Sequence, residues 1–289
     1  MAAVRPYSEE ISRTKPSCIA FLVDQSGSMA EGFEDVPAAD AAKAQGAADA
    51  LNRCLANIIM RCTKDEGIRD YFYVGIWGYG QSVSTALPGT DPEHPLVPVS
   101  ELYTLSRIEN RVRQIPDGKG GMREQTIKYP VWIDPQADGE TPMCDAFDTV
   151  RASMNTWMEE HPDSYPPTII NITDGASTDG DPRYTAWKIM QTQNGNRSKA
   201  LLFNIHITAN SKLPPILYPS ADNELQSYAK NLFEMSSELP DKLVIEAVMG
   251  GMDIQEGAHG FVFNGGLNDL IRFLDIGTRM TAMADMREG

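Results

Sequence analysis

The fold of this 289-residue chain is decided by one stretch, CIAFLVDQSGS at residues 18–28. Its first six residues are apolar without interruption, which is typical of a strand buried on both faces of a parallel sheet. The apolar run ends at Asp24, and a short loop with Ser26 and Ser28 follows. We therefore expect a buried parallel strand that carries oxygen-bearing side chains at its carboxyl end.

Apolar runs and segments with one apolar face alternate along the rest of the chain. The expected helices include residues 38–63 and 143–157, and the expected strands include 71–77, 168–173, 200–208 and 261–263. Such alternation predicts an α/β fold: a mostly parallel central sheet with helices on both faces. Residues 82–87 follow a Gly-rich turn, so we expect them to fold back as one antiparallel edge strand.

Residues 88–139 differ from their surroundings because they hold seven of the nineteen prolines. Proline removes a backbone donor, so long regular structure is disfavoured there. We expect one helix, since Leu102, Leu105, Ile108, Val112 and Ile115 fall on one helical face, and an edge strand at 127–133 that Pro130 limits. We interpret residues 1–289 as a single domain with a core at about 17–280 and a Pro-rich elaboration at about 88–139.

The composition is acidic and globular. The chain has 25 basic and 40 acidic residues, a net charge of −15, and a hydrophobic fraction of 42%. This charge argues against nucleic acid or a membrane as the main partner, because both require clustered Lys and Arg. The four cysteines form no close pair, which argues against zinc clusters and disulfide scaffolds. With no apolar leader at the start, we expect a cytoplasmic protein.

Three loops carry small oxygen-bearing side chains: residues 24–28, 139–142 and 173–175. In an open α/β sheet, loops at the carboxyl ends of strands share one edge, so Asp24 and Asp174 should meet there. Hydroxyl and carboxylate oxygens suit a hard cation, and Mg²⁺ or Mn²⁺ is favoured over Ca²⁺. The predicted ligands are Asp24, Ser26, Ser28, Thr141 and Asp174. The first loop alone would be an ordinary turn, because Asp and Ser also favour turns.

These residues resemble the metal-ion-dependent adhesion site (MIDAS) of the von Willebrand factor A (vWA) domain family. Asp24, Ser26 and Ser28 are similar to its first motif, Thr141 to its isolated threonine and Asp174 to its final aspartate. The resemblance implies a Rossmann-like vWA fold. It also implies a divalent cation whose shell is completed by an Asp or Glu of a partner protein.

Short strings elsewhere resemble bacterial intracellular members of the tellurium-resistance Y type. They are residues 130–132 (PVW), 172–175 (ITDG), 204–207 (NIHI) and 273–277 (FLDIG). The resemblance implies a scaffold or adaptor in a bacterial signalling, stress-response or defence complex. A Ser/Thr kinase and a metal-dependent phosphatase are the implied partners.

Sequence motifs of catalysis are missing. The chain has no phosphate-binding G-x-x-x-x-G-K-[ST] motif, no dinucleotide fingerprint and no nucleophile elbow around Ser26, so we expect no enzyme. Two alternatives stay open: an adaptor for a MoxR-type AAA+ ATPase, and a phosphoester hydrolase that uses metal-activated water. We expect His206 to be a core or hydrogen-bonded histidine rather than a ligand. We also expect Asp179 and Asp181 to cap a helix that begins at Pro182.

Overall fold

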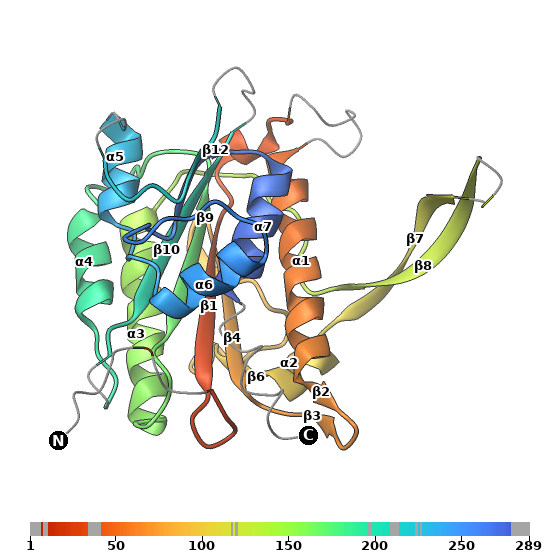
Figure 1. The fold of residues 1–289 in the computed structure, drawn as a ribbon, viewed down its shortest axis with the longest axis horizontal. Helices are drawn as coiled ribbons and strands as arrows, with labels where there is room; N and C mark the ends of the chain where they lie inside the picture. Colours follow the sequence, from red (N-terminus) through yellow and green to blue (C-terminus); the bar gives the residue numbers. More distant parts are fainter. Residues whose placement is uncertain are drawn as a thin grey trace.

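The computed structural model describes residues 7, 11–33, 42–116, 118, 121–195, 198–208, 214–222, 225 and 227–278. Its central sheet has the strand order β11-β12-β10-β9-β1-β4-β5. The parallel strands are β1 (Ser17–Asp24), β4 (Phe72–Tyr79), β9 (Thr168–Thr173), β10 (Leu201–Ile207) and β12 (Phe261–Gly265). Figure 1 shows β1 in the middle of the fold, between β9 and β4.

Strand β1 is buried along its whole length, as its apolar sequence predicts. It pairs in parallel with β4, where Asp24 lies opposite Tyr79, and with β9, where Val23 lies opposite Ile172. The ends of β1 and β9 are therefore adjacent in the sheet. This places Asp24 beside the loop that follows β9.

Short antiparallel strands complete the edges of the sheet. Strands β5 (Val83–Thr85) and β6 (Val97–Pro98) pair with β4, and β11 (Ile216–Leu217) pairs with β12. The predicted return of residues 82–87 onto the neighbouring strand is therefore confirmed. The α/β fold class with a mostly parallel sheet is confirmed as well.

Helices cover both faces of the sheet, and alternate residues of β1 divide the core between them. Ile19 and Phe21 face one hydrophobic cluster with Leu51 of α1 (Lys43–Cys62), whereas Ala20 and Leu22 face another with Phe147 of α3 (Met143–Glu160). Figure 1 shows α1 and α7 (Leu267–Gly277) on one side and α3, α4 (Arg183–Gln191) and α5 (Ser227–Glu234) on the other. The described part of the chain also contains α2 (Val99–Thr104) and α6 (Asp241–Met249).

The predicted helix through Leu102, Leu105, Ile108, Val112 and Ile115 is wrong. Helix α2 ends at Thr104, and residues 107–116 form β7 (Arg107–Pro116), which pairs with β8 (Met122–Val131) over ten residue pairs. The apolar residues Ile108 and Val112 of β7 are exposed and do not pack against the core. Their helical spacing therefore does not mark the buried face of a helix. β-Branched residues favour a strand when a partner strand is present, and β8 is that partner.

The expected edge strand at residues 127–133 falls partly within β8, but β8 pairs with β7 and not with the central sheet. Figure 1 shows the β7–β8 hairpin reaching away from the body of the protein. A further short hairpin, β2 (Thr63–Lys64) with β3 (Gly67–Ile68), follows α1. Among the described residues, no helix is long and apolar enough to span a membrane.

Candidate metal centre

Four of the five predicted ligands are joined by hydrogen bonds at the carboxyl edge of the sheet. The hydroxyl oxygens of Ser26 and Ser28 lie 3.0 Å apart, and the Ser28 hydroxyl donates to Asp174 Oδ1 at 2.8 Å. The Ser26 N–H donates to Asp24 Oδ1 at 2.9 Å. Residues 146 positions apart in the sequence are thus in direct contact, because β1 and β9 are neighbours.

Asp24 is the buried end of this cluster. Its exposed fraction is 0%, and its second oxygen, Oδ2, accepts a hydrogen bond from the Thr173 hydroxyl at 2.7 Å. Burial raises the pKa of Asp24 to about 6, even though hydrogen bonds from Ser26 and Thr173 oppose the rise. A buried carboxylate with this environment is stabilised in its charged form by a nearby cation.

The two serines are held by a tight loop that continues into the 3-10 helix η1 (Gly27–Ala30). Ser26 is 3% exposed, whereas Ser28 is exposed to solvent. The oxygen cluster therefore runs from the sheet interior at Asp24 to the surface at Ser28. A ligand at Ser28 would be reachable from outside.

Thr141 reaches this edge through its loop. The Gly27 N–H donates to Gly139 O at 3.0 Å, and the Asp138 N–H donates to Gln25 O at 2.6 Å, so the second loop lies directly against the first. Gly139 has φ +100°, and a Cβ there would lie 2.4 Å from the Gln81 nitrogen. Only glycine allows this approach, which brings Thr141, 5% exposed, next to the candidate site.

The loop that follows β9 is anchored to the second loop. Thr141 N–H donates to the Thr178 hydroxyl oxygen, and Thr178 N–H donates to Thr141 O, both at 3.0 Å. Thr141 and Asp174 are therefore carried by loops that hold each other in place. The structure brings all five predicted residues to one edge of the sheet, and their role as metal ligands stays a prediction.

Sequence reasoning missed Lys43, whose side chain enters the same cluster. Lys43 is the first residue of α1 and is 3% exposed. Its Nζ lies 2.6 Å from Asp174 Oδ2 and 3.0 Å from Glu31 Oε2. The available signal was its position one helical turn before the buried Ala47, because a charge on the apolar stripe of a helix needs a buried partner.

His206 lies beside the candidate site, near the end of β10. Its ring stacks on Phe263, with centroids 4.5 Å apart, and its Nδ1 accepts the Asn264 N–H at 3.3 Å. Burial lowers the pKa of His206 to about 4, while its interaction with Asp174 acts in the opposite direction. The imidazole is therefore neutral at pH 7, and it is partly buried and hydrogen-bonded, in agreement with the hydrogen-bonded alternative of the prediction.

Asp179 does not cap the helix that follows Pro182, so that part of the prediction is wrong. Its carboxylate instead accepts the N–H groups of Cys144 and Asp145 in the first turn of α3, at 3.0 and 2.9 Å. Partial burial raises the pKa of Asp179, but hydrogen bonds from Ser177 and these backbone groups outweigh it and lower the pKa overall. Asp181 does cap α4, because it accepts the Arg183 N–H at 3.1 Å.

The donor set fits a hard divalent cation. The Ser28 hydroxyl lies within hydrogen-bonding distance of both the Ser26 hydroxyl and Asp174 Oδ1, and Asp24 adds a buried carboxylate. Within the described ranges, no three His, Cys, Asp or Glu side chains cluster in a way that could hold a metal. The predicted ligands offer hydroxyl and carboxylate oxygens, a donor set that suits Mg²⁺ or Mn²⁺ better than a softer metal.

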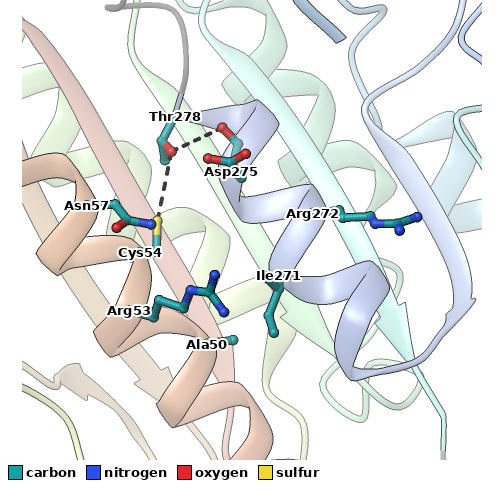
Figure 2. A pocket seen from close by; sticks show the side chains of 8 residues that line it. All are labelled: Ala50, Arg53, Cys54, Asn57, Ile271, Arg272, Asp275 and Thr278. Carbon is teal, nitrogen blue, oxygen red and sulfur yellow. Dashed lines mark hydrogen bonds between the residues drawn. The ribbon is translucent and has the colours of Figure 1, made fainter. Parts of the chain in front are cut away.

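A pocket of about 140 Å³ lies elsewhere, between α1 and α7. Figure 2 shows the side chains that line it, among them Arg53, Cys54 and Asp275. None of the five predicted ligands lines this pocket. It is separate from the candidate metal centre.

Comparison with known proteins supports the fold. No protein-family model and no curated protein matches the sequence. Proximal thread matrix protein 1 (PTMP1) from the mussel byssus is similar in structure, with 15% identity over 95% of this chain and 50% of that chain, and a TM-score of 0.51. The chain spans about half the length of PTMP1, and the likeness shows the fold alone.

Other neighbours are more distant. The PilB minor pilin from Streptococcus sanguinis has 11% identity over 99% of this chain and 65% of its own, with a TM-score of 0.49. The vWF domain of the pilus tip protein Mfa5 from Porphyromonas gingivalis has 14% identity over 56% and 39%, with a TM-score of 0.33. PTMP1 has also been solved with a zinc-occupied MIDAS motif, at a TM-score of 0.49 to this chain.

The likeness to PTMP1 and the strand order agree in showing a mixed α/β fold with a mostly parallel sheet, which is the fold that the resemblance implied. The finer likeness to the tellurium-resistance Y type stays a prediction. So does the presence of a working MIDAS in this chain.

Proposed function

We propose that this protein is a non-catalytic binding module that uses a divalent cation to bind a partner protein. Asp24, Ser26, Ser28, Thr141 and Asp174 would hold Mg²⁺ or Mn²⁺, and an Asp or Glu of the partner would complete the shell. The observation that carries the proposal is the chain of contacts from Ser26 through Ser28 to Asp174, which opens to solvent at Ser28.

The residues of the chain would share the work of binding. The two serine hydroxyls supply oxygen atoms without cancelling positive charge, and Asp24 is fixed in orientation because both of its oxygens accept hydrogen bonds. Thr173 holds Asp24 and is itself held, since its hydroxyl oxygen accepts the Gly175 N–H at 3.2 Å. When bound, the cation supplies a positive charge at a protein surface, where a carboxylate binds it with a charge-assisted contact.

The proposed setting is a complex in a bacterial cytoplasm, where the module acts as a scaffold or adaptor in signalling, stress response or defence. A Ser/Thr kinase and a metal-dependent phosphatase are the proposed partners. The net charge of −15 supports a selective contact of this kind, because an acidic surface repels acidic proteins except where a bound cation reverses the local charge.

Metal-dependent capture tests the proposal. The immobilised protein is exposed to host lysate with Mg²⁺, with EDTA, and as a Ser26→Ala/Ser28→Ala variant shown to be folded by circular dichroism. A protein bound only by the wild type in Mg²⁺, and released by EDTA, is the expected result. Mn²⁺ and Zn²⁺ are compared in parallel arms, because the neighbour PTMP1 was solved with zinc.

Capture that is equal in all three arms would contradict the proposal, because the binding surface would then lie away from the candidate site. The identity of the captured protein distinguishes between the two proposed kinds of adaptor. A kinase or phosphatase supports the proposed setting, whereas an AAA+ ATPase supports the other kind of adaptor. Metal-dependent hydrolysis of a generic phosphoester that is lost in Asp24→Ala would contradict the non-catalytic role.

A further inference from the structure

Lys43 places a buried ammonium group against a carboxylate of the candidate metal centre. Its Nζ lies 2.6 Å from Asp174 Oδ2, while Asp174 Oδ1 accepts the Ser28 hydroxyl at 2.8 Å. The side chain of Asp174 is 0% exposed, and that of Lys43 is 4% exposed. Asp174 is thus shared between a predicted metal ligand and a cation that belongs to the protein itself.

This placement of Lys43 is energetically unusual. Lysine is almost never fully buried unless it is paired. Lys43 is also the first residue of α1, where the positive end of the helix dipole disfavours a cation. Both effects oppose the ammonium group, so the nearby carboxylates of Asp174 and Glu31 must offset them.

The backbone fixes the start of the Lys43 side chain. The Lys43 N–H donates to Glu31 O at 2.8 Å, and Gly32 and Ala42 form an antiparallel bridge next to it. The Glu31 carboxylate, in contrast, is 66% exposed and contacts the same ammonium group at 3.0 Å. Lys43 therefore has a surface carboxylate beside it to which it can remain paired when it leaves Asp174.

The charges at the edge indicate what this contact does. Asp24 and Asp174 bring two negative charges to the candidate centre, and the Lys43 ammonium balances one of them. Two cations that share one buried carboxylate repel each other, and this repulsion is stronger near protein than in bulk water. A divalent cation that binds Asp174 therefore competes with Lys43 for this carboxylate.

This inference rests on the proposed function. We propose that Lys43 sets the metal affinity of the centre, because its ammonium group competes with the divalent cation for Asp174. In the metal-free protein Lys43 balances one of the two carboxylate charges, and on metal binding it leaves Asp174 and stays paired with Glu31. The centre then binds metal more weakly than its oxygen ligands alone would, which makes the added partner carboxylate more important.

A pair of matched lysine variants tests the competition. Lys43→Met keeps an apolar side chain of similar length and removes the charge. Lys188→Met is the control, since it also removes one lysine from an ion pair, with Asp148 at 2.7 Å on α3. Mn²⁺ alone is titrated into each protein, and bound metal is quantified by electron paramagnetic resonance. We expect Lys43→Met to bind Mn²⁺ at least about tenfold more tightly and the control to match wild type.

The outcomes separate this inference from the proposed function. If folded Lys43→Met bound Mn²⁺ as tightly as wild type or more weakly, the proposed competition would be wrong. The proposal of a metal site would not be affected. No Mn²⁺ binding by wild type, Lys43→Met or Lys188→Met would overturn the metal site itself.

A second measurement needs no variant, so it decides the matter even if Lys43→Met does not fold. Wild-type protein is treated with an amine-reactive reagent with and without Mn²⁺, and modification of each lysine is measured by mass spectrometry. Modification of Lys43 should rise when Mn²⁺ is added, while that of Lys188 stays constant. Unchanged modification of Lys43 at a saturating Mn²⁺ concentration would contradict its displacement.

Discussion

The candidate metal centre and the β7–β8 hairpin both carry many polar side chains, yet they are built in opposite ways. The centre lies at the ends of β1 and β9, whose residues are buried on both faces. In the hairpin, Ile108, Val112 and Met122 are each more than half exposed. The centre therefore takes its geometry from the core, whereas the hairpin takes its geometry from pairing between its own two strands.

The hairpin is tied to the body at one end. Arg111 forms an ion pair with Asp49 of α1 at 2.7 Å, and the Tyr129 hydroxyl donates to Asp49 O at 3.0 Å. Beyond the hairpin, the side chain of Asn52 binds the backbone of Trp132 and Ile133. The comparison teaches that residues far from the core can keep a defined structure when one end is anchored to α1.

The largest expected effect is a loss of stability when a core side chain next to the metal centre is truncated, with no such loss in the hairpin. Phe21→Ala removes a side chain that is 0% exposed in β1, and should lower the free energy of unfolding by about 3–5 kcal/mol. Val112→Ala in the hairpin is the matched control and should change it by less than about 0.5 kcal/mol. Chemical denaturation measures both. Similar losses in the two variants would mean that the hairpin packs against something in solution.

A smaller loss of unfolding free energy is expected when the hydrogen bonds next to the base of the hairpin are removed. Asn52 is 1% exposed, and its side chain accepts the Trp132 N–H at 2.8 Å and donates to Ile133 O at 3.0 Å. Asn52→Ala leaves these buried backbone groups without partners, so we expect a loss of about 1–3 kcal/mol in denaturation. Asn57→Ala, one to two turns along the same helix, is the control and should be nearly neutral. If Asn52→Ala did not change the stability, the hydrogen bonds of Asn52 would not anchor the segment that follows the hairpin.

Loss of the ion pair at the base should affect the hairpin but not the centre. Asp49→Ala removes the partner of Arg111, a pair in which both side chains are about one third exposed. Such a partly exposed pair contributes at most about 1 kcal/mol. Hydrogen exchange should become faster in β7 and β8 and stay unchanged in β1 and β9. Faster exchange in β1 would show that the two regions are coupled.

The smallest effect should follow removal of the outer hairpin. Replacing residues 112–126 by a short Gly-Ser turn keeps Arg111 and Tyr129 and deletes the outer pairs of the two strands. We expect the free energy of unfolding to change by less than about 1 kcal/mol, because none of the described residues that are removed belongs to the buried core. Mn²⁺ affinity should stay within about twofold of wild type in a titration. A larger drop in affinity would assign the hairpin a part in the metal centre.

The two regions also differ in how far the sequence predicts them. Asp24 and Asp174 could be brought together from the sequence because each directly follows a buried apolar run, and parallel strands place such ends at one edge. The positions of Ser26, Ser28 and Thr141 followed from the loops next to those ends. Lys43 could not be found in this way, because a helical apolar stripe gives no sign of which carboxylate a charged residue on it would meet.

The hairpin was misread because amphipathic spacing depends on a core that defines the buried face. Leu102 is buried and belongs to α2, but Ile108 and Val112 are exposed on β7, so the shared helical spacing of these residues is coincidental. Asp179 shows a related limit. Its place just before Pro182 favours a local cap, yet its carboxylate binds the start of α3, which is distant in sequence.

The most direct test of the metal centre is a crystal of the wild-type protein soaked with Mn²⁺ and measured by anomalous diffraction. The predicted result is a Mn²⁺ peak in contact with the hydroxyl oxygens of Ser26 and Ser28, with the Lys43 ammonium moved away from Asp174. The Ser26→Ala/Ser28→Ala variant should lose that peak. A fully soaked wild-type crystal without a peak at this edge, or with Mn²⁺ bound only elsewhere, would contradict the metal centre.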